Sequence, residues 1–368
     1  MSEPSTAAME SASIPRAAAA RAWALHLLCL VLPATCLLFA LTAPHPWWAS
    51  ARWFGVVVAS VIVDMRAGEE RGQPSPLIPG WPFDGVLLVL SGLQLVNVAL
   101  LVRMVAIHGF FRMDTMVAVM LQGITSGYSG IVVAHELIHR KEQHLHLLGR
   151  VLLGVVLYEH FATEHIRGHH VRVGTASDPA TARFGETRIQ HLRRNVPQQF
   201  RSAWQLECTR LGDPSMPLLD RRQAANRVLH GVVLEWGVAL AVLGFLGMGP
   251  FVFYLLQAWT AIVLLECVNF FEHWGLTRDG RRVQPIDSWD TASWFTLYTL
   301  VGLSRHADHH ANAARPYQQL RYFDESPKLP SGYFGMVVLA VFQPKRYAAL
   351  MTEELERRKL GPFAATMC

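Results

Sequence analysis

Charged residues are scarce in this chain of 368 residues, of which 51% are hydrophobic and 17% are charged. A soluble domain carries about a quarter charged residues, so the composition argues against an ordinary soluble protein. Cysteine is scarce too, and no two of the five cysteines form a CxxC pair. Their scatter excludes a disulfide framework and the tetracysteine sites that hold zinc or a single iron.

The chain also lacks the features of a secretory signal. Residues 1–20 are small, polar and rich in alanine, without the basic start and short apolar core that such a signal requires. We expect these residues to form a mobile cytoplasmic tail. The sequence contains no nucleic-acid-binding motif, so we expect no nucleic-acid partner.

Long apolar runs, by contrast, are abundant. Six of them are long enough, or nearly so, to cross about 30 Å of hydrocarbon as helices. They are 21–43, 48–64, 84–107, 114–134, 228–248 and 250–272. Two shorter apolar pieces, 147–158 and 333–342, are typical of interfacial or re-entrant segments. The predicted fold is therefore an all-α integral membrane protein with six transmembrane helices.

The basic residues predict how these spans are oriented. If the N-terminus is cytoplasmic, only Arg52, Arg103 and Arg112 of the 33 Lys and Arg fall on the far side of the membrane. This asymmetry follows the positive-inside rule and predicts a protein of the inner (cytoplasmic) cell membrane. The net charge of +5 would lie almost wholly on the cytoplasmic face, which suits anionic lipid or an acidic protein partner.

Nine of the 17 histidines fall in four clusters that this topology brings to one side of the membrane. The first begins where the fourth span reaches the cytoplasm, and the second follows in the next loop. The third ends the sixth span, and the fourth lies in the C-terminal region. The members are His135 and His139; His165, His169 and His170; His273; and His306, His309 and His310.

This arrangement predicts a metal site. Histidines four residues apart share one face of a helix, and nine histidines exceed the ligands of one ion, so we expect two ions. Imidazole suits zinc, copper, iron and nickel, so the ligands alone do not choose the metal. HELIH (135–139) also matches the zinc-protease motif, and an intramembrane zinc protease is an alternative that leaves most of the clusters unexplained. A purely structural role for all four clusters is the remaining interpretation.

Several other polar residues are predicted to support the site rather than to bind metal. Carboxylates beside the clusters are placed to accept a hydrogen bond from the outer nitrogen of a ligating histidine; these are Glu136, Glu164, Glu272 and Asp308. Glu266 and Asn269, near the end of the sixth span, are buried polar groups of the kind that are functional by default. Asp64, at the inner end of the second span, is expected to be a hydrogen-bond partner for the site, and His160, five residues before His165, is expected to support it.

Four motifs resemble those of a known family. They are HELIHRKE (135–142), EHIRGHH (164–170), NFFEHWGL (269–276) and RHADHHANAARPYQQLR (305–321). In this order they resemble the integral-membrane non-haem di-iron alkane hydroxylases (alkane 1-monooxygenases), and more distantly the xylene monooxygenases and membrane fatty-acid desaturases. SDPATARFGE (177–186) and LPSGYFG (329–335) extend the likeness over roughly residues 60–345.

The resemblance implies a cytoplasmic site with two non-haem irons held by the nine histidines, and O2 as co-substrate. It also implies one-electron delivery by rubredoxin or a similar small iron–sulfur carrier, with an NAD(P)H reductase. We therefore expect a membrane oxygenase domain over 21–345 and a cytoplasmic C-terminal segment over 346–368. The expected reaction is hydroxylation of a terminal methyl group of an alkane or similar hydrocarbon, held in an apolar channel between spans two, three, four and six.

Three residues depart from the family pattern. Ser304 replaces a glutamine, Asp287 stands where a histidine is usual, and Trp274 replaces a tyrosine. None is one of the nine histidines, so the expected metal site stands while a plain alkane substrate is put in question. Alternatives with the same site are a fatty-acid desaturase or decarboxylase and a hydroxylase of aromatic or terpenoid methyl groups. A metal- or haem-binding membrane carrier is the alternative that is not an enzyme.

Overall fold

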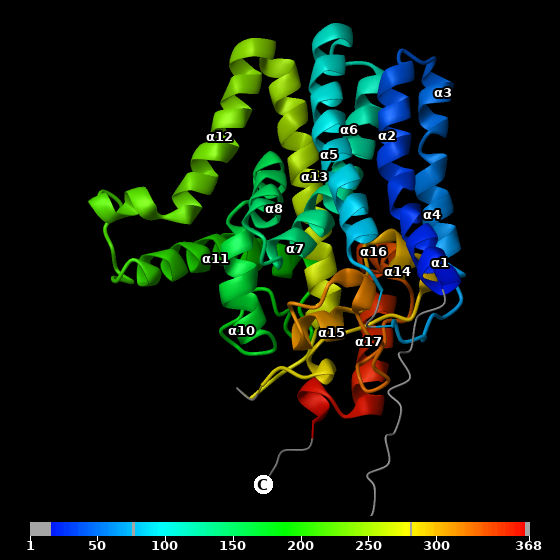
Figure 1. Ribbon diagram of the computed structural model, residues 1–368, viewed down its shortest axis with the longest axis vertical. Coiled ribbons are helices and arrows are strands. Elements are labelled where there is room, and N and C mark those ends of the chain that lie inside the picture. The colour runs from blue at the N-terminus through cyan, green and yellow to red at the C-terminus, as the bar shows by residue number, and fades with distance from the viewer. Residues whose placement is uncertain (1–15, 76–77, 280–281, 365–368) are drawn as a thin grey trace, which may run out of the picture.

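The computed structural model describes residues 16–75, 78–279 and 282–364, and these are arranged as a tall bundle of helices with smaller helices below it (Figure 1). Within these described ranges, six helical segments are long and apolar enough to cross a membrane: Ala18–Thr42, Trp47–Met65, Trp81–His108, Met113–Ile138, Arg227–Leu246 and Met248–His273. These segments confirm the prediction of an all-α protein with six long apolar helices, each within a few residues of the predicted run. The protein is thus an integral membrane protein.

The first span is built from three helical pieces. They are α1 (Arg16–His26), the 3₁₀ turn η1 (Leu27–Leu30) and α2 (Val31–Thr42). The tighter turn lies just before Pro33, whose ring cannot follow a regular α-helical turn and which has no N–H to donate. Of the predicted tail 1–20, the first fifteen residues lie outside the described residues and the last five begin α1.

The second and third spans stand beside the first. The second comprises α3 (Trp47–Arg52) and α4 (Gly55–Met65), and the third is the single helix α5 (Trp81–His108). Helix α5 ends at Gly109, whose φ of 75° is the left-handed conformation that glycine adopts most readily.

The fourth span leads directly into the first histidine cluster. It runs through α6 (Met113–Thr125), the π-helix η2 (Ser126–Val132) and α7 (Val133–Ile138). Its glycines allow close packing: a Cβ on Gly123 would lie 2.5 Å from Cβ of Thr260 on the sixth span, and one on Gly130 would lie 3.1 Å from the Gln94 amide on α5. These small residues therefore bring helices together, as is common in membranes.

The segment between spans four and five forms a shelf of helices. It comprises α8 (Gln143–Val155), α9 (Phe161–Glu164), the π-helix η3 (His165–His169), α10 (His170–Arg172), α11 (Arg188–Arg210) and the 3₁₀ turn η4 (Arg221–Ala225). Helix α11 begins with a capping box between Thr187 and Gln190, and it runs across the direction of the spans (Figure 1).

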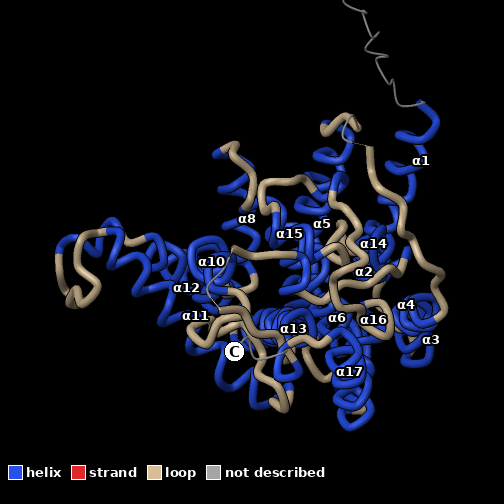
Figure 2. The backbone as a smooth tube through the Cα atoms, turned by 90° about the horizontal axis from the view of Figure 1, so that it is seen from below, coloured by secondary structure: helices blue, strands red, loops and turns tan. Residues whose placement is uncertain are grey.

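Spans five and six form a hairpin, and the C-terminal region packs beneath the bundle. The hairpin joins α12 (Arg227–Leu246) to α13 (Met248–His273). The remaining elements are η5 (Pro285–Asp287), α14 (Trp294–Thr299), α15 (His306–Ala311), η6 (Tyr317–Gln319), α16 (Tyr333–Phe342), α17 (Pro344–Arg358) and η7 (Gly361–Phe363). Seen from below, α15 lies among α5, α8, α10 and α14 (Figure 2), which centres its histidines under the spans.

Candidate metal centre

The nine predicted histidines come together in two groups at this end of the bundle. In each group the potential ligand atoms all lie within 4.8 Å of one another. The first histidine group consists of His135, His139, His165, His170 and His309. The second histidine group consists of His169, His273, His306 and His310.

The π-helix η3 decides how its histidines are shared between the groups. Spacing alone suggested that His165 and His169, four residues apart, face the same way. A π-helix instead brings residues i and i+5 together, and His165 accordingly joins His170 in the first histidine group. His169 belongs to the second histidine group, so η3 and the residue after it contribute histidines to both groups.

The ring nitrogens point at one another across each group. Nε2 of His170 lies 2.9 Å from Nε2 of His165 and 3.0 Å from Nε2 of His309. In the second histidine group, Nε2 of His306 lies 3.1 Å from Nε2 of His273. The two groups touch where the rings of His170 and His310 stack, with 4.3 Å between centroids.

Burial keeps six of the imidazoles outside the spans neutral at physiological pH. Burial lowers the pKa of His139 to about 4. Burial and, after it, the neighbouring imidazoles lower the pKa well below 6.5 for His165, His170, His306, His309 and His310. A neutral imidazole keeps the lone pair that a metal ion needs.

The donor set fits two nitrogen-ligated metal ions. Several buried ring nitrogens have no hydrogen-bond partner among the described residues: Nε2 of His139 and His169, Nδ1 of His165 and His273, and both nitrogens of His310. Buried polar atoms are almost always satisfied, so this many unpartnered nitrogens at one place indicate a site for cations.

Asp178 supports the second histidine group, and the sequence analysis did not single it out. Its Oδ2 lies 2.9 Å from Nδ1 of His169 and accepts a hydrogen bond from Thr181 Oγ1 at 2.6 Å. Although burial opposes ionisation, His169 and Thr181 hold the pKa of Asp178 at about 2. An ionised carboxylate on Nδ1 fixes the tautomer whose Nε2 faces the group. The sequence feature that could have pointed to Asp178 is the motif SDPATARFGE (177–186). Asp178 and Glu186 are the two carboxylates in this motif that could accept a hydrogen bond from a ligating histidine.

Of the carboxylates predicted beside the clusters, Glu272 lies against a histidine of a group. Its Oε1 is 3.3 Å from Nδ1 of His306, and it accepts a hydrogen bond from the Tyr333 hydroxyl at 2.6 Å. Glu272 thereby connects the second histidine group to α16.

The other three carboxylates pair with arginines or backbone N–H groups. Glu136 Oε1 lies 2.9 Å from Nη2 of Arg140 and accepts a hydrogen bond from the backbone N–H of Tyr317. Glu164 accepts a hydrogen bond from Arg172 at 2.6 Å. Asp308 lies 3.0 Å from Arg315 Nε, and it accepts hydrogen bonds from Asn312 and from the backbone and side chain of Arg321. These three carboxylates brace the histidine-bearing segments rather than the rings themselves.

Gly168 has a role at Glu164. A Cβ on this glycine would lie 2.5 Å from the Glu164 carboxylate oxygens and 2.4 Å from Arg172. The absence of a side chain at Gly168 therefore makes room for the ion pair between Glu164 and Arg172, which lies beside the segment that carries His165, His169 and His170.

The polar residues predicted at the span ends lie further from the rings. Glu266 accepts hydrogen bonds from Tyr158, Asn195, Gln199 and, at 3.4 Å, from Asn269. Asp64 accepts hydrogen bonds from Ser293 and Thr296 and so joins α4 to α14. His160 packs edge-on against Tyr158 and Phe200.

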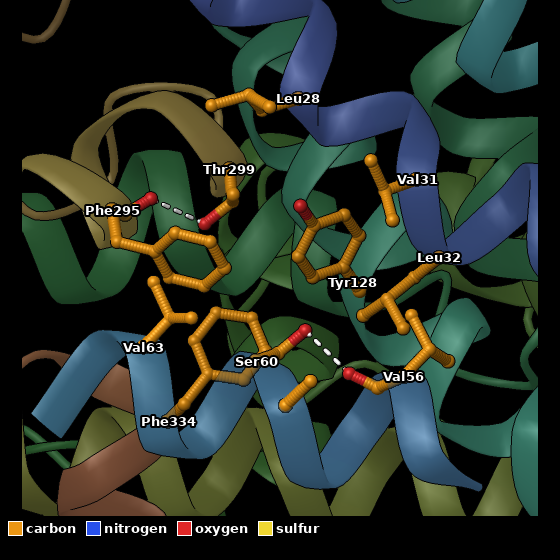
Figure 3. A pocket seen from close by; sticks show the side chains of 11 residues that line it. Leu28, Val31, Leu32, Val56, Ser60, Val63, Tyr128, Phe295, Thr299 and Phe334 are labelled. Carbon is orange, nitrogen blue, oxygen red and sulfur yellow. Dashed lines mark hydrogen bonds between the residues drawn. The ribbon is translucent and has the colours of Figure 1, made fainter.

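An apolar cavity of about 170 Å³ lies between the spans. Its walls come from the first, second and fourth spans and from α14 and α16 (Figure 3). Tyr128, on the wall, is seven residues before His135 in the fourth span, which is about 10 Å along a helix. Spans two and four, which were predicted to line a substrate channel with spans three and six, contribute to this cavity together with the first span.

Comparisons with known proteins agree with this architecture. The fatty acid desaturase family model matches residues 114–339. Alkane 1-monooxygenase 1 of Pseudomonas aeruginosa is 37% identical over 337 residues, which are 84% of this chain and 86% of the relative. Alkane 1-monooxygenase 2 of Alcanivorax borkumensis is 32% identical over 315 residues, 81% of this chain and 80% of the relative.

A more distant relative shares the central part of the chain. The hydroxylase component of the xylene/toluene monooxygenase of Pseudomonas putida is 23% identical over 235 residues, 62% of each chain. The match to alkane 1-monooxygenases is therefore both higher in identity and longer. The chain belongs to the fatty acid desaturase family and, within it, to the alkane 1-monooxygenase-like di-iron oxidoreductases of membranes.

Proposed function

We propose that this protein is a membrane monooxygenase that hydroxylates a terminal methyl C–H of an alkane or similar hydrocarbon, using O2 and externally supplied electrons. The observation that carries the proposal is the division of nine histidines into two groups of converging ring nitrogens, in which several ring nitrogens have no hydrogen-bond partner among the described residues. Bound there, two iron ions would supply the activation of O2 from which one oxygen atom is inserted into the C–H bond.

The residues that would hold the two ions are the two histidine groups themselves. His135, His139, His165, His170 and His309 would hold one ion, and His169, His273, His306 and His310 the other. Asp178 would keep His169 in the tautomer that faces the ion, and the Glu272 carboxyl lies beside Nδ1 of His306. Burial of these rings keeps bulk water away from the reacting atoms.

The cavity in Figure 3 suits an unfunctionalised hydrocarbon chain. Most of its wall is aliphatic or aromatic, and two of its hydroxyls are already bonded, Ser60 to the Val56 carbonyl and Thr299 to the Phe295 carbonyl. A chain held there gains about 0.8 kcal/mol per buried methylene. Because the wall is mostly apolar, the depth of insertion would select the carbon that is presented to the metals, and this favours the terminal methyl group.

The zinc-protease alternative fits the geometry less well. In that mechanism the glutamate of HELIH must act as a general base on metal-bound water. Here Glu136 is held by Arg140 and by the backbone of Tyr317. The zinc interpretation also leaves the second histidine group without a role.

We further propose that the histidine side of the membrane is the cytoplasmic side of the inner cell membrane. The span topology predicted from the sequence assigns all but three of the 33 Lys and Arg to that side, in keeping with the positive-inside rule. A small acidic carrier such as rubredoxin, reduced by an NAD(P)H-dependent reductase, would suit this basic face as electron donor.

A product screen tests the proposal. The purified protein, supplied with iron, a rubredoxin, its reductase and NADH, is given octane, dodecane, xylene or lauric acid, and products are identified by mass spectrometry. We expect terminal alcohols from an alkane and about two irons per chain. Alkenes, ring-methyl alcohols or hydroxy acids as sole products would overturn the substrate assignment, and one zinc per chain with peptidase activity would overturn the reaction class.

A further inference from the structure

Helix α11 is fixed to the bundle by a polar stripe, and this leaves its other side free. His191, Asn195 and Gln199, four residues apart, are buried, and the last two donate hydrogen bonds to the buried carboxylate of Glu266 on α13. The helix runs across the spans at the level where α12 begins (Figure 1). We therefore expect α11 to lie along the surface of the leaflet on the histidine side.

A groove of about 390 Å³ runs between α11, the chain before α9, and α13. Its walls are mostly apolar and are formed by Leu157, Tyr158, Val196, Pro197, Phe200 and Ile262. It lies near α12, whose side chains Val233, Trp236 and Leu240 are 65%, 48% and 56% exposed. Large apolar side chains exposed on a membrane-length helix face lipid, so the groove borders the bilayer.

His160 lines this groove and lacks a partner. Its side chain is 7% exposed, and its Nε2 has no hydrogen-bond partner among the described residues. Burial lowers the pKa of His160 to about 3, so the ring is neutral and offers one N–H donor. A buried polar atom without a partner is costly, which indicates that a ligand supplies one.

Arg201 lines the same groove and is exposed, and within the described ranges no carboxylate pairs with it. Two other arginines of α11 do have carboxylate partners: Arg194 pairs with Glu186, and Arg210 pairs with Glu207. Arg201 differs from the exposed Arg193 in that it lines the groove. A guanidinium that pairs with no carboxylate of the described residues and a neutral imidazole donor thus line one groove, and both groups can donate hydrogen bonds to an anion.

From these contacts we infer that the groove binds one anionic phospholipid of the leaflet on the histidine side. Its phosphate would accept hydrogen bonds from Arg201 and His160, and an acyl chain would lie along Leu157 and Ile262 toward the bilayer. This site is separate from the two histidine groups and goes beyond the proposed hydroxylation.

Lipid binding is measured on the full chain purified in mild detergent. Native mass spectrometry counts retained phosphatidylglycerol, and thermal unfolding is followed with added phosphatidylglycerol or phosphatidylcholine of the same acyl chains. The variants are Arg201→Gln and His160→Phe. Arg193→Gln is the matched control, because Arg193 is an exposed arginine of the same helix that does not line the groove.

We expect the unchanged protein and Arg193→Gln to retain one phosphatidylglycerol and to be stabilised by it. Arg201→Gln should bind it about tenfold more weakly, as expected for one lost charge-assisted hydrogen bond, and His160→Phe should also bind it less tightly. Equal retention by Arg201→Gln and Arg193→Gln would overturn the inference, as would equal stabilisation by phosphatidylcholine. Stabilisation by inorganic phosphate or laurate alone would show a soluble anion site instead. None of these readouts depends on hydroxylation, so they leave the proposed function to its own test.

Discussion

Two of the polar clusters buried among the described residues differ in whether their hydrogen bonds are complete. One lies within the spans, where Ser126 accepts hydrogen bonds from Gln94 and Gln122 at 2.8 and 2.9 Å and donates one to Gln257 at 2.6 Å. Cys36 of the first span joins through Gln122. Four spans thus meet in one network, which we call the amide cluster: Cys36, Gln94, Gln122, Ser126 and Gln257.

The histidine groups, only a few turns further along the fourth span, are incomplete. In the amide cluster none of the side-chain polar atoms is without a partner, whereas several ring nitrogens in the histidine groups are. A complete network in a low-dielectric interior specifies how helices pack, and an incomplete one is costly until something binds. We therefore infer that the amide cluster stabilises helix packing and that the histidine groups bind a ligand. Four experiments test these two roles.

The largest effect is expected from removing one histidine of each group. His309→Ala and His273→Ala should each lower the iron content below two per chain. Each should reduce hydroxylation by more than the roughly 10- to 100-fold that is typical of losing a residue hydrogen-bonded to a metal ligand. Iron is measured by inductively coupled plasma mass spectrometry. His144→Ala, at an exposed position outside both groups, is the control. Full activity in either variant would remove that group from the metal site.

The next effect concerns Asp178. Asp178→Asn keeps the shape but loses the charge that holds Nδ1 of His169, so iron affinity should fall about 10- to 100-fold. Iron titration of the metal-free protein measures this. Glu353→Gln, an exposed carboxylate on α17, should change nothing. An Asp178→Asn protein with normal affinity would show that His169 needs no outer partner.

The sequence predicts which histidines come together, but it does not predict how they divide into two groups. The gathering of nine histidines at one membrane face follows from span topology and is found. Their division is not predictable from spacing, because the π-helical turn η3 pairs His165 with His170. Asp178 reaches His169 only through the fold of the loop after α10. The share of the first span in the cavity depends on the tertiary packing of Leu28, Val31 and Leu32 against α4, which no local pattern encodes.

A smaller effect is expected from pH in the metal-free protein. The pKa of His139 is lowered to about 4 in the folded state from an unperturbed value near 6.5, and other rings of both groups shift the same way. The unfolded chain therefore binds protons first as pH falls, so stability should decrease from about pH 6.5 toward pH 4. Thermal unfolding after chelation, compared with the iron-loaded protein, measures it. If the metal-free protein were equally stable at pH 7 and pH 5, the inference that the buried imidazoles are neutral in the folded state would be wrong.

The smallest effect, and the one that separates the two clusters, is expected at Ser126. Ser126→Ala removes the shared partner of Gln94, Gln122 and Gln257 and should cost about 1–2 kcal/mol of stability. Ser91→Ala on α5 is the matched control, because Ser91 bonds only to the carbonyl of Leu87 in its own helix. Both variants should keep two irons and normal turnover per iron, since a completed network contributes packing alone. Loss of iron from Ser126→Ala with Ser91→Ala unaffected would mean that the amide cluster also sets the geometry of the metal site, by holding η2 and hence the direction in which α7 presents His135 and His139.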